Sequence, residues 1–302
     1  MNSKERDEVI TMAGWDDILK ELGETPSQID FVRRKYLTEL AEYTGRVAIA
    51  YYSAFTEKDG SNLDVNDGDM EGFMNALKGV DYSKGLDLLL HTPGGDPTAA
   101  EAIVNYLREK FDDNIRVIVP QIAMSAGTMI ACSAKEIVMG RQSSLGPIDP
   151  QFMGIPAHNI KDEFEEAKAD LANNPENAQY WAIKLQQYPA AFMKTAIDAI
   201  ELSDELIRNW LKDVMLKDCP EKVDDAVAFL SSHENSKVHA RHYRYKECRE
   251  HGLNITLMED DPELQDRILS VHHAFMITFQ HSDAIKIIAN SNKKDYVIGR
   301  SH

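Results

Sequence analysis

Short apolar runs alternate with segments of helical periodicity through the first half of the chain. The runs are rich in β-branched and aromatic residues and predict strands at 46–53, 86–93, 115–120 and 136–140. Between them, apolar residues recur every three or four positions, which predicts helices at 69–80, 96–111 and 125–134. Fully apolar strands that alternate with helices are typical of a parallel sheet buried on both faces, so the pattern indicates the α/β class.

The two ends of the chain are predominantly helical in pattern. Residues 1–44 predict two or three amphipathic helices, with Gly23 and Gly45 as stops. After residue 158 amphipathic segments dominate; residues 245–259 predict a short helix and a last strand, and residues 262–280 a final long helix. No low-complexity linker interrupts the pattern. We therefore expect one domain over 1–302, with an N-terminal helical segment (1–45), a core (46–157) and a helical elaboration and closing segment (158–302).

Composition excludes several classes of function. The 302 residues carry 33 Lys and Arg against 50 Asp and Glu, a net charge of −17, which argues against a nucleic-acid partner. No P-loop, GxGxxG or HExxH pattern occurs, so no nucleotide, other cofactor or metal is expected. Three cysteines without a CxxC pair fit a reducing cytoplasm.

The longest uncharged run lies between Arg116 and Lys135. Pro120 and Gln121 interrupt it, so it predicts a buried strand and a buried helix and no membrane span. The charged N-terminus lacks the apolar stretch of a signal peptide. These features together predict a cytoplasmic protein.

Two junctions between a strand and a helix carry residues suited to chemistry. The strand at 86–93 ends in a turn with Gly94 and Gly95, and the next strand is followed by Ser125 and Ala126 at a helix start. Taken separately, each junction fits tight helix–sheet packing. Because active sites gather at the carboxyl ends of parallel strands, the pair indicates acyl transfer, with Ser125 as nucleophile and backbone N–H groups binding the oxyanion.

The motifs "LLLHTPGG", "IVPQIAMSAGTMIA" and "SSLGPIDPQ" resemble those of serine peptidases with the ClpP/crotonase fold. The signal peptide peptidase A and serine dehydrogenase proteinase families are the most similar, and the likeness is dense over 46–157. It implies a spiral of repeated β-β-α units, Ser125 as nucleophile, and an oxyanion hole from Gly94, Gly95 and Ala126. It also implies ATP-independent cleavage of peptides or unfolded proteins, and a homo-oligomer.

The general base is where the sequence departs from the Clp-type pattern. The position at which that pattern has a histidine is occupied by Asp149, 24 residues after Ser125, and the position of its aspartate falls near His239 and His242. We hypothesise that the pair is exchanged, with His239 and Asp149 acting on Ser125. A neutral imidazole suits a general base near neutral pH.

Alternatives remain for both the base and the function. A Ser–Lys dyad like that of signal peptide peptidase A would use Lys161 or Lys168, although neighbouring carboxylates favour their charged form; His158 lies close by. A crotonase-type acyl-CoA enzyme would use the same oxyanion hole without a serine nucleophile. A catalytically inactive peptide-binding or scaffold protein would need no base.

Overall fold

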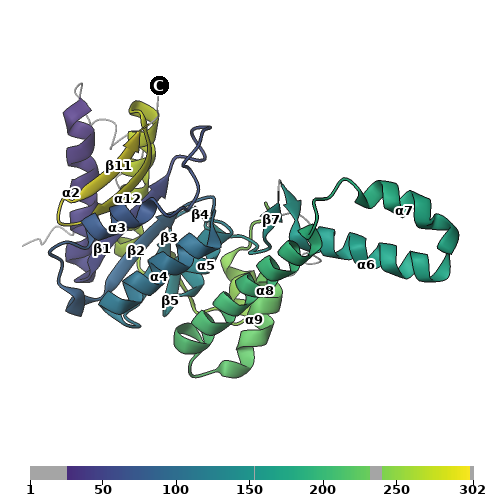
Figure 1. The fold of residues 1–302 in the computed structure, drawn as a ribbon. Coiled ribbons are helices and arrows are strands. Elements are labelled where there is room, and N and C mark those ends of the chain that lie inside the picture. Colours follow the sequence, from purple (N-terminus) through teal and green to yellow (C-terminus); the bar gives the residue numbers. More distant parts are fainter. Residues whose placement is uncertain (1–25, 153, 232–239, 300–302) are drawn as a thin grey trace, which may run out of the picture.

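A computed structural model describes residues 26–152, 154–231 and 240–299. Its centre is a seven-stranded sheet in the order β11-β10-β1-β2-β3-β5-β9, in which β1, β2, β3, β5 and β9 are parallel (Figure 1). The strands of this sheet span Val47–Ser53 (β1), Leu86–His91 (β2), Ile115–Val119 (β3), Glu136–Met139 (β5), Ile255–Leu257 (β9), Ala284–Asn290 (β10) and Asp295–Gly299 (β11). The predicted α/β class with a mostly parallel buried sheet is confirmed.

Helices cover both faces of the sheet. On one face Ile49 and Tyr51 of β1 pack into a core formed with helices α3, α4 and α5, and on the other Ala50 and Tyr52 pack toward α2 and α12. This alternation follows from the two-residue period of a strand. The helices span Pro26–Thr44 (α2), Asp69–Ala76 (α3), Pro97–Phe111 (α4), Ala126–Cys132 (α5) and Pro262–His281 (α12).

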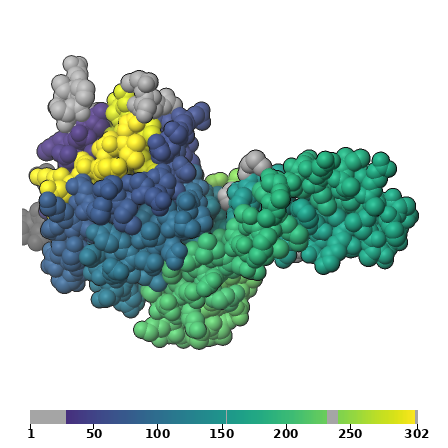
Figure 2. All heavy atoms as spheres, viewed as in Figure 1, coloured from purple at the N-terminus to yellow at the C-terminus, as the bar shows by residue number. Residues whose placement is uncertain are grey.

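Between β5 and β9 the described residues are mostly helical and form an elaboration that projects from the sheet. It contains Ala157–Asn173 (α6), Ala178–Leu185 (α7), Phe192–Trp210 (α8), Val223–Ser231 (α9) and Tyr245–Glu250 (α11). Figure 1 shows α6 and α7 as an arm that extends away from the body, and Figure 2 shows its surface free of contact with the sheet domain along most of its length. Pro189 lies in the break between α7 and α8.

The strands predicted at 46–53, 86–93, 115–120 and 136–140 are confirmed as β1, β2, β3 and β5, whereas the carboxyl end differs from the prediction; the helices expected before residue 26 lie outside the described residues. Asp96 caps α4, since its side chain accepts a hydrogen bond from the Thr98 N–H. The expectation that the strand at 255–257 is the last one is wrong, because β10 and β11 follow α12 as an antiparallel hairpin. β10 then pairs antiparallel with β1. Three of the four residues in Ile285–Ile288 are β-branched, which favours a strand, but the prediction of a final helix did not take them into account.

Candidate active site

A second row of strand pairing crosses the carboxyl ends of the central strands. Thr92 forms a bridge to Ala123, Ala123 pairs with Leu145, and Leu145 forms an antiparallel bridge to Tyr243. The paired pieces include β4 (Ile122–Ala123) and β6 (Ser144–Leu145). The chain after β2, β3 and β5 therefore continues past the main sheet into this row, and the segment of Tyr243 joins it. The row brings four segments that are distant in sequence to one edge of the protein.

The Pro-Gly-Gly turn lies directly against the start of α5. Gly94 has φ +94°, and a Cβ there would lie 2.5 Å from the Met124 carbonyl oxygen and 2.6 Å from the Ser125 Cβ. Gly127 permits a similar close approach, since a Cβ on it would meet the Thr92 methyl group at 2.5 Å. The glycines are thus required by contact between the two junctions.

Val65 fixes the outer side of the same turn. Its N–H donates to the Gly94 carbonyl at 2.7 Å, and its carbonyl accepts from the Asp96 N–H at 2.9 Å. The N–H of Gly94 donates to the Thr92 hydroxyl at 3.2 Å. In a trans peptide the C=O and the following N–H point in opposite directions, so the Gly95 N–H is directed away from Val65.

Ser125 occupies a backbone conformation that normally requires glycine. Its φ is +49° and its ψ −119°, and the Gly127 N–H donates to the Met124 carbonyl at 2.7 Å. These values describe a tight turn of type II′ with a serine at its first central position. A non-glycine residue in such a conformation costs about 1–3 kcal/mol and is a feature that clusters at functional sites.

The Ser125 hydroxyl is not consumed by local structure. It makes no capping bond to α5, and no side chain within the described ranges hydrogen bonds to it. The N–H of Ala126, as the first residue of the helix, has no acceptor within α5. Thr128 braces the turn, since its hydroxyl donates to the carbonyl oxygens of Ala123 at 2.9 Å and Gly146 at 3.0 Å, two alternative acceptors for one hydroxyl proton.

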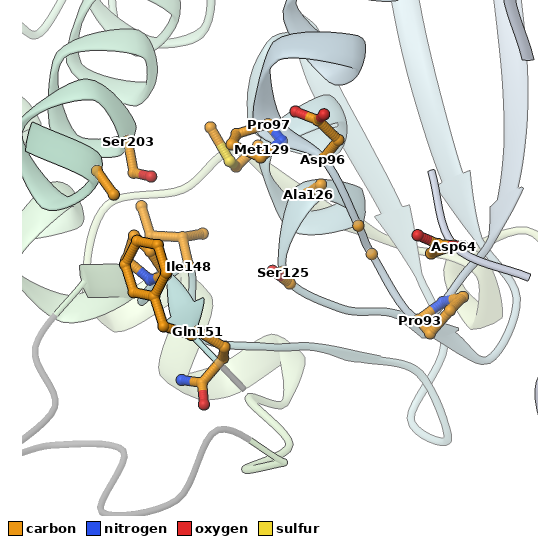
Figure 3. A pocket seen from close by; sticks show the side chains of 15 residues that line it. Asp64, Pro93, Asp96, Pro97, Ser125, Ala126, Met129, Ile148, Gln151 and Ser203 are labelled. Carbon is orange, nitrogen blue, oxygen red and sulfur yellow. The ribbon is translucent and has the colours of Figure 1, made fainter. Parts of the chain in front are cut away.

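Ser125 opens into a cavity of about 620 Å³ between the core and α8. Figure 3 places Ser125 between Asp64 and Pro93 on one side and Ile148 and Ser203 on the other. The side toward α8 is predominantly apolar, with lining residues that include Pro97, Met129, Ile148, Phe152 and Ala199. A cavity of this volume accommodates part of a peptide chain.

Two of the residues predicted as candidate partners of Ser125, Asp149 and His242, lie close to this edge of the sheet. Asp149 is fully buried and accepts a hydrogen bond from Gln151 at 2.9 Å, while its neighbours Ile148 and Pro150 line the cavity. His242 is exposed, and its Nδ1 lies 2.7 Å from the Ser144 hydroxyl. His239 lies outside the described residues. The Leu145–Tyr243 bridge nevertheless joins the segment before Asp149 to the segment that follows these histidines in sequence.

The alternative bases on α6 do not line the cavity. Lys161 is exposed, and the side chain of Lys168 is 80% exposed with Glu165 at 3.7 Å. His158 interacts electrostatically with Asp204 of α8; burial raises the pKa of Asp204, and Ser231 and His158 oppose that rise. A lysine base needs burial to lose its proton, and neither lysine has it.

The sequence reasoning did not single out the segment around Val65. It reads as a polar loop in sequence, and its pairing with the glycine turn depends on tertiary contacts. Within the described ranges, no group of histidine, cysteine and acidic side chains is arranged to hold a metal ion, and no helix has both the length and the apolar character needed to cross a bilayer.

Comparisons with known proteins identify a family model and two relatives that are similar to this chain. A family model described as "ClpP-like SDH-type serine proteinase" matches residues 63–228, which include both junctions and much of the helical elaboration. The chain is 33% identical over 187 residues to the uncharacterized protein MJ0137 of Methanocaldococcus jannaschii, an alignment that covers 62% of this chain and 59% of that protein. It is 38% identical over 96 residues to MJ1495 of the same organism, covering 32% of each. The chain thus spans less than two thirds of the length of either relative.

Proposed function

Because the chain belongs to the ClpP-like SDH-type serine proteinase family, we propose that it is a serine peptidase with Ser125 as its nucleophile. The observation that carries the proposal is the strained backbone of Ser125, at φ +49°, at the mouth of a cavity. The turn presents the hydroxyl at the start of α5 without a capping bond. Strain at a hydroxyl to which no side chain of the described residues hydrogen bonds is typical of a functional site.

The reaction proceeds through an acyl-enzyme. The Ser125 oxygen attacks the peptide carbonyl carbon while its proton passes to the general base, and a tetrahedral oxyanion forms. Collapse of this intermediate breaks the C–N bond, and the base returns the proton to the leaving amine. Water then attacks the ester by the same route, and Ser125 regains its proton.

The oxyanion is held by the N–H groups of Gly95 and Ala126. The Gly94 N–H is already bonded to Thr92, so of the paired glycines Gly95 is the better donor. Gly94 contributes the close contact with Ser125 that brings the turn to the reacting carbon. Donors fixed before the reaction stabilise developing charge most strongly, because they need no reorganisation.

The general base is proposed to be His239, oriented by Asp149, with His242 as the alternative. Asp149 follows Leu145 by four residues and His239 precedes Tyr243 by four, so the two positions are equally distant in sequence from the Leu145–Tyr243 bridge. Burial of Asp149 suits an orienting carboxylate. His239→Ala and His242→Ala, compared for hydrolysis rate, assign the role: the variant of the base loses about 10²-fold or more.

The substrate is proposed to be a peptide or an unfolded protein segment, with an apolar side chain in the part of the cavity toward α8. The protein is further proposed to act as a homo-oligomer, with the arm as a contact element. Tyr180 and Ile183 on α7 are 59% and 66% exposed, which suits an apolar contact between copies. Light scattering of the wild type and of Tyr180→Ser/Ile183→Ser tests this.

A fluorophosphonate probe tests the nucleophile directly. The intact protein is expected to form a covalent adduct on Ser125, located by mass spectrometry of tryptic peptides, and Ser125→Ala is expected to form none. Thr128→Ser serves as a control and is expected to form the adduct as the wild type does, since serine keeps the hydroxyl that donates to the Ala123 carbonyl. Turnover of an acyl-CoA by Ser125→Ala would instead establish a crotonase-type enzyme. Peptide binding without any adduct in the wild type would establish a scaffold.

A further inference from the structure

A fully buried ion pair lies outside the cavity, beneath the loop that contacts the glycine turn. The Lys286 Nζ of β10 is 2.7 Å from an Asp69 carboxylate oxygen of α3, and both side chains are 0% exposed. The Tyr51 hydroxyl donates to the other oxygen at 2.5 Å. Burying two charges is costly, and apolar replacements of such pairs are often as stable, so stability alone explains this pair poorly.

The network holds both sides of Val65. Lys286 also donates to the Asp64 carbonyl at 2.6 Å, and Asp69 accepts from the Asn66 N–H at 3.0 Å. One bond therefore fixes the residue before Val65, and the other fixes the residue after it. Each of these hydrogen bonds has a charged donor or a charged acceptor. Such bonds are stronger than hydrogen bonds between neutral groups.

Val65 in turn sets the orientation of the glycine turn. It bonds to the Gly94 carbonyl and to the Asp96 N–H, so the Gly94–Gly95 peptide plane cannot rotate without breaking these bonds. A rotation of this plane would move the Gly95 N–H away from the oxyanion. The path from Lys286 to the oxyanion thus consists of hydrogen bonds through Asp64, Val65 and Gly94.

We propose that Lys286 is a positioning residue for the oxyanion hole, acting through Asp64 and Val65 on the Gly95 N–H. The inference rests on the proposed peptidase function. Lys286 touches neither substrate nor Ser125. Lys286 holds the Gly95 N–H in one orientation. Because this donor is needed only in the transition state, loss of Lys286 lowers kcat and leaves KM nearly unchanged.

The test compares Lys286→Met with the double variant Lys286→Met/Asp69→Asn. The single variant leaves the Asp69 charge buried without its partner and is expected to lose stability as well. Asn66 and Tyr51 both donate to the same oxygen of Asp69, so in the double variant the single carbonyl oxygen of the new amide can accept both bonds, while the anchor to the Asp64 carbonyl is gone. Hydrolysis of a fluorogenic peptide and the second-order rate of fluorophosphonate labelling are measured per mole of folded protein.

The matched control is Asp87→Asn at the opposite edge of the sheet. Asp87 is also 0% exposed and pairs with Arg46 at 2.7 Å and Arg116 at 2.8 Å, but it lies at the amino end of β2. It is expected to lower the melting temperature without changing the labelling rate of the folded protein. The control therefore distinguishes displacement of the Gly95 N–H from a general loss of stability.

We expect the double variant to label and turn over about 10- to 100-fold more slowly at unchanged KM, since losing one oxyanion donor outright costs about 10²–10³ in kcat. Wild-type kcat in the folded double variant, or a decrease equal to that of Asp87→Asn, would overturn the proposal. Failure of the wild type to label at all would count against the peptidase function itself, which distinguishes the two failures.

Discussion

Ser125→Gly is expected to make the protein more stable while it abolishes catalysis. At φ +49° and ψ −119° a serine is strained by about 1–3 kcal/mol, and glycine adopts these angles freely. Glycine loses about 0.5–1 kcal/mol more backbone entropy on folding than other residues. The net gain over Ser125→Ala, which lacks the hydroxyl but keeps the strain, is therefore about 0.5–2 kcal/mol.

Thermal unfolding measures this difference. With about 2.1 cal/mol/K of unfolding entropy per residue, a 302-residue chain gains about 1.6 °C for each kcal/mol, so Ser125→Gly should melt about 1–3 °C above Ser125→Ala. Ala191→Gly is the positive control, because Ala191 at φ +64° is a left-handed residue away from the cavity. If Ala191→Gly raises the melting temperature and Ser125→Gly does not exceed Ser125→Ala, the strain argument is refuted.

Three further predictions concern the turn, a buried histidine and the cavity. Gly94→Ala is expected to lower the hydrolysis rate at least about 100-fold, because its Cβ would collide with Ser125. The control is Gly79→Ala, because Gly79 has φ +81° and a Cβ there would meet no atom within 4 Å. This variant is expected to lose about 1 kcal/mol of stability and to keep the hydrolysis rate. Burial lowers the pKa of His91 to about 3, so its stabilisation is present above pH 6.5 and is lost as the pH falls toward 3. In denaturant titrations the free energy of unfolding should fall between pH 6.5 and 4.5, and His91→Phe should reduce this fall by about 2–3 kcal/mol, while the buried His272, whose pKa burial also lowers, contributes to the remainder. An equal fall in the variant would refute this. Ala199→Phe should raise KM about tenfold for peptides with large apolar side chains while Glu201→Phe, exposed on the same helix, leaves it unchanged; equal KM values would contradict the cavity assignment.

Much of the site was predictable because strands and helices are local patterns of burial. Apolar runs located β1, β2, β3 and β5, and the carboxyl ends of parallel strands located Gly94, Gly95 and Ser125 at one edge. The order of strands along the sheet was less accessible. The hairpin β10–β11 packs beside β1 although 230 residues separate β10 from β1 in sequence, and no local signal specifies such a neighbour.

The hydrogen-bond directions at the site were also beyond the sequence. The sequence does not distinguish Gly94 from Gly95 as the oxyanion donor. Only the hydrogen bonds of Gly94 to Thr92 and Val65 do so. The assignment depends on a loop that reads as polar and irregular. Its role appears only when its contact with the turn is known.

The sequence by itself determined that this protein has a buried parallel sheet, a serine at a strand end and a glycine turn one unit before it. It did so because burial imposes a period on the chain and glycine marks close approach. The tertiary structure alone decided the strained angles of Ser125, the direction of the Gly95 N–H and the buried Lys286–Asp69 pair beneath them. Those features depend on contacts between residues far apart in sequence, and such contacts exist only once the sheet has assembled.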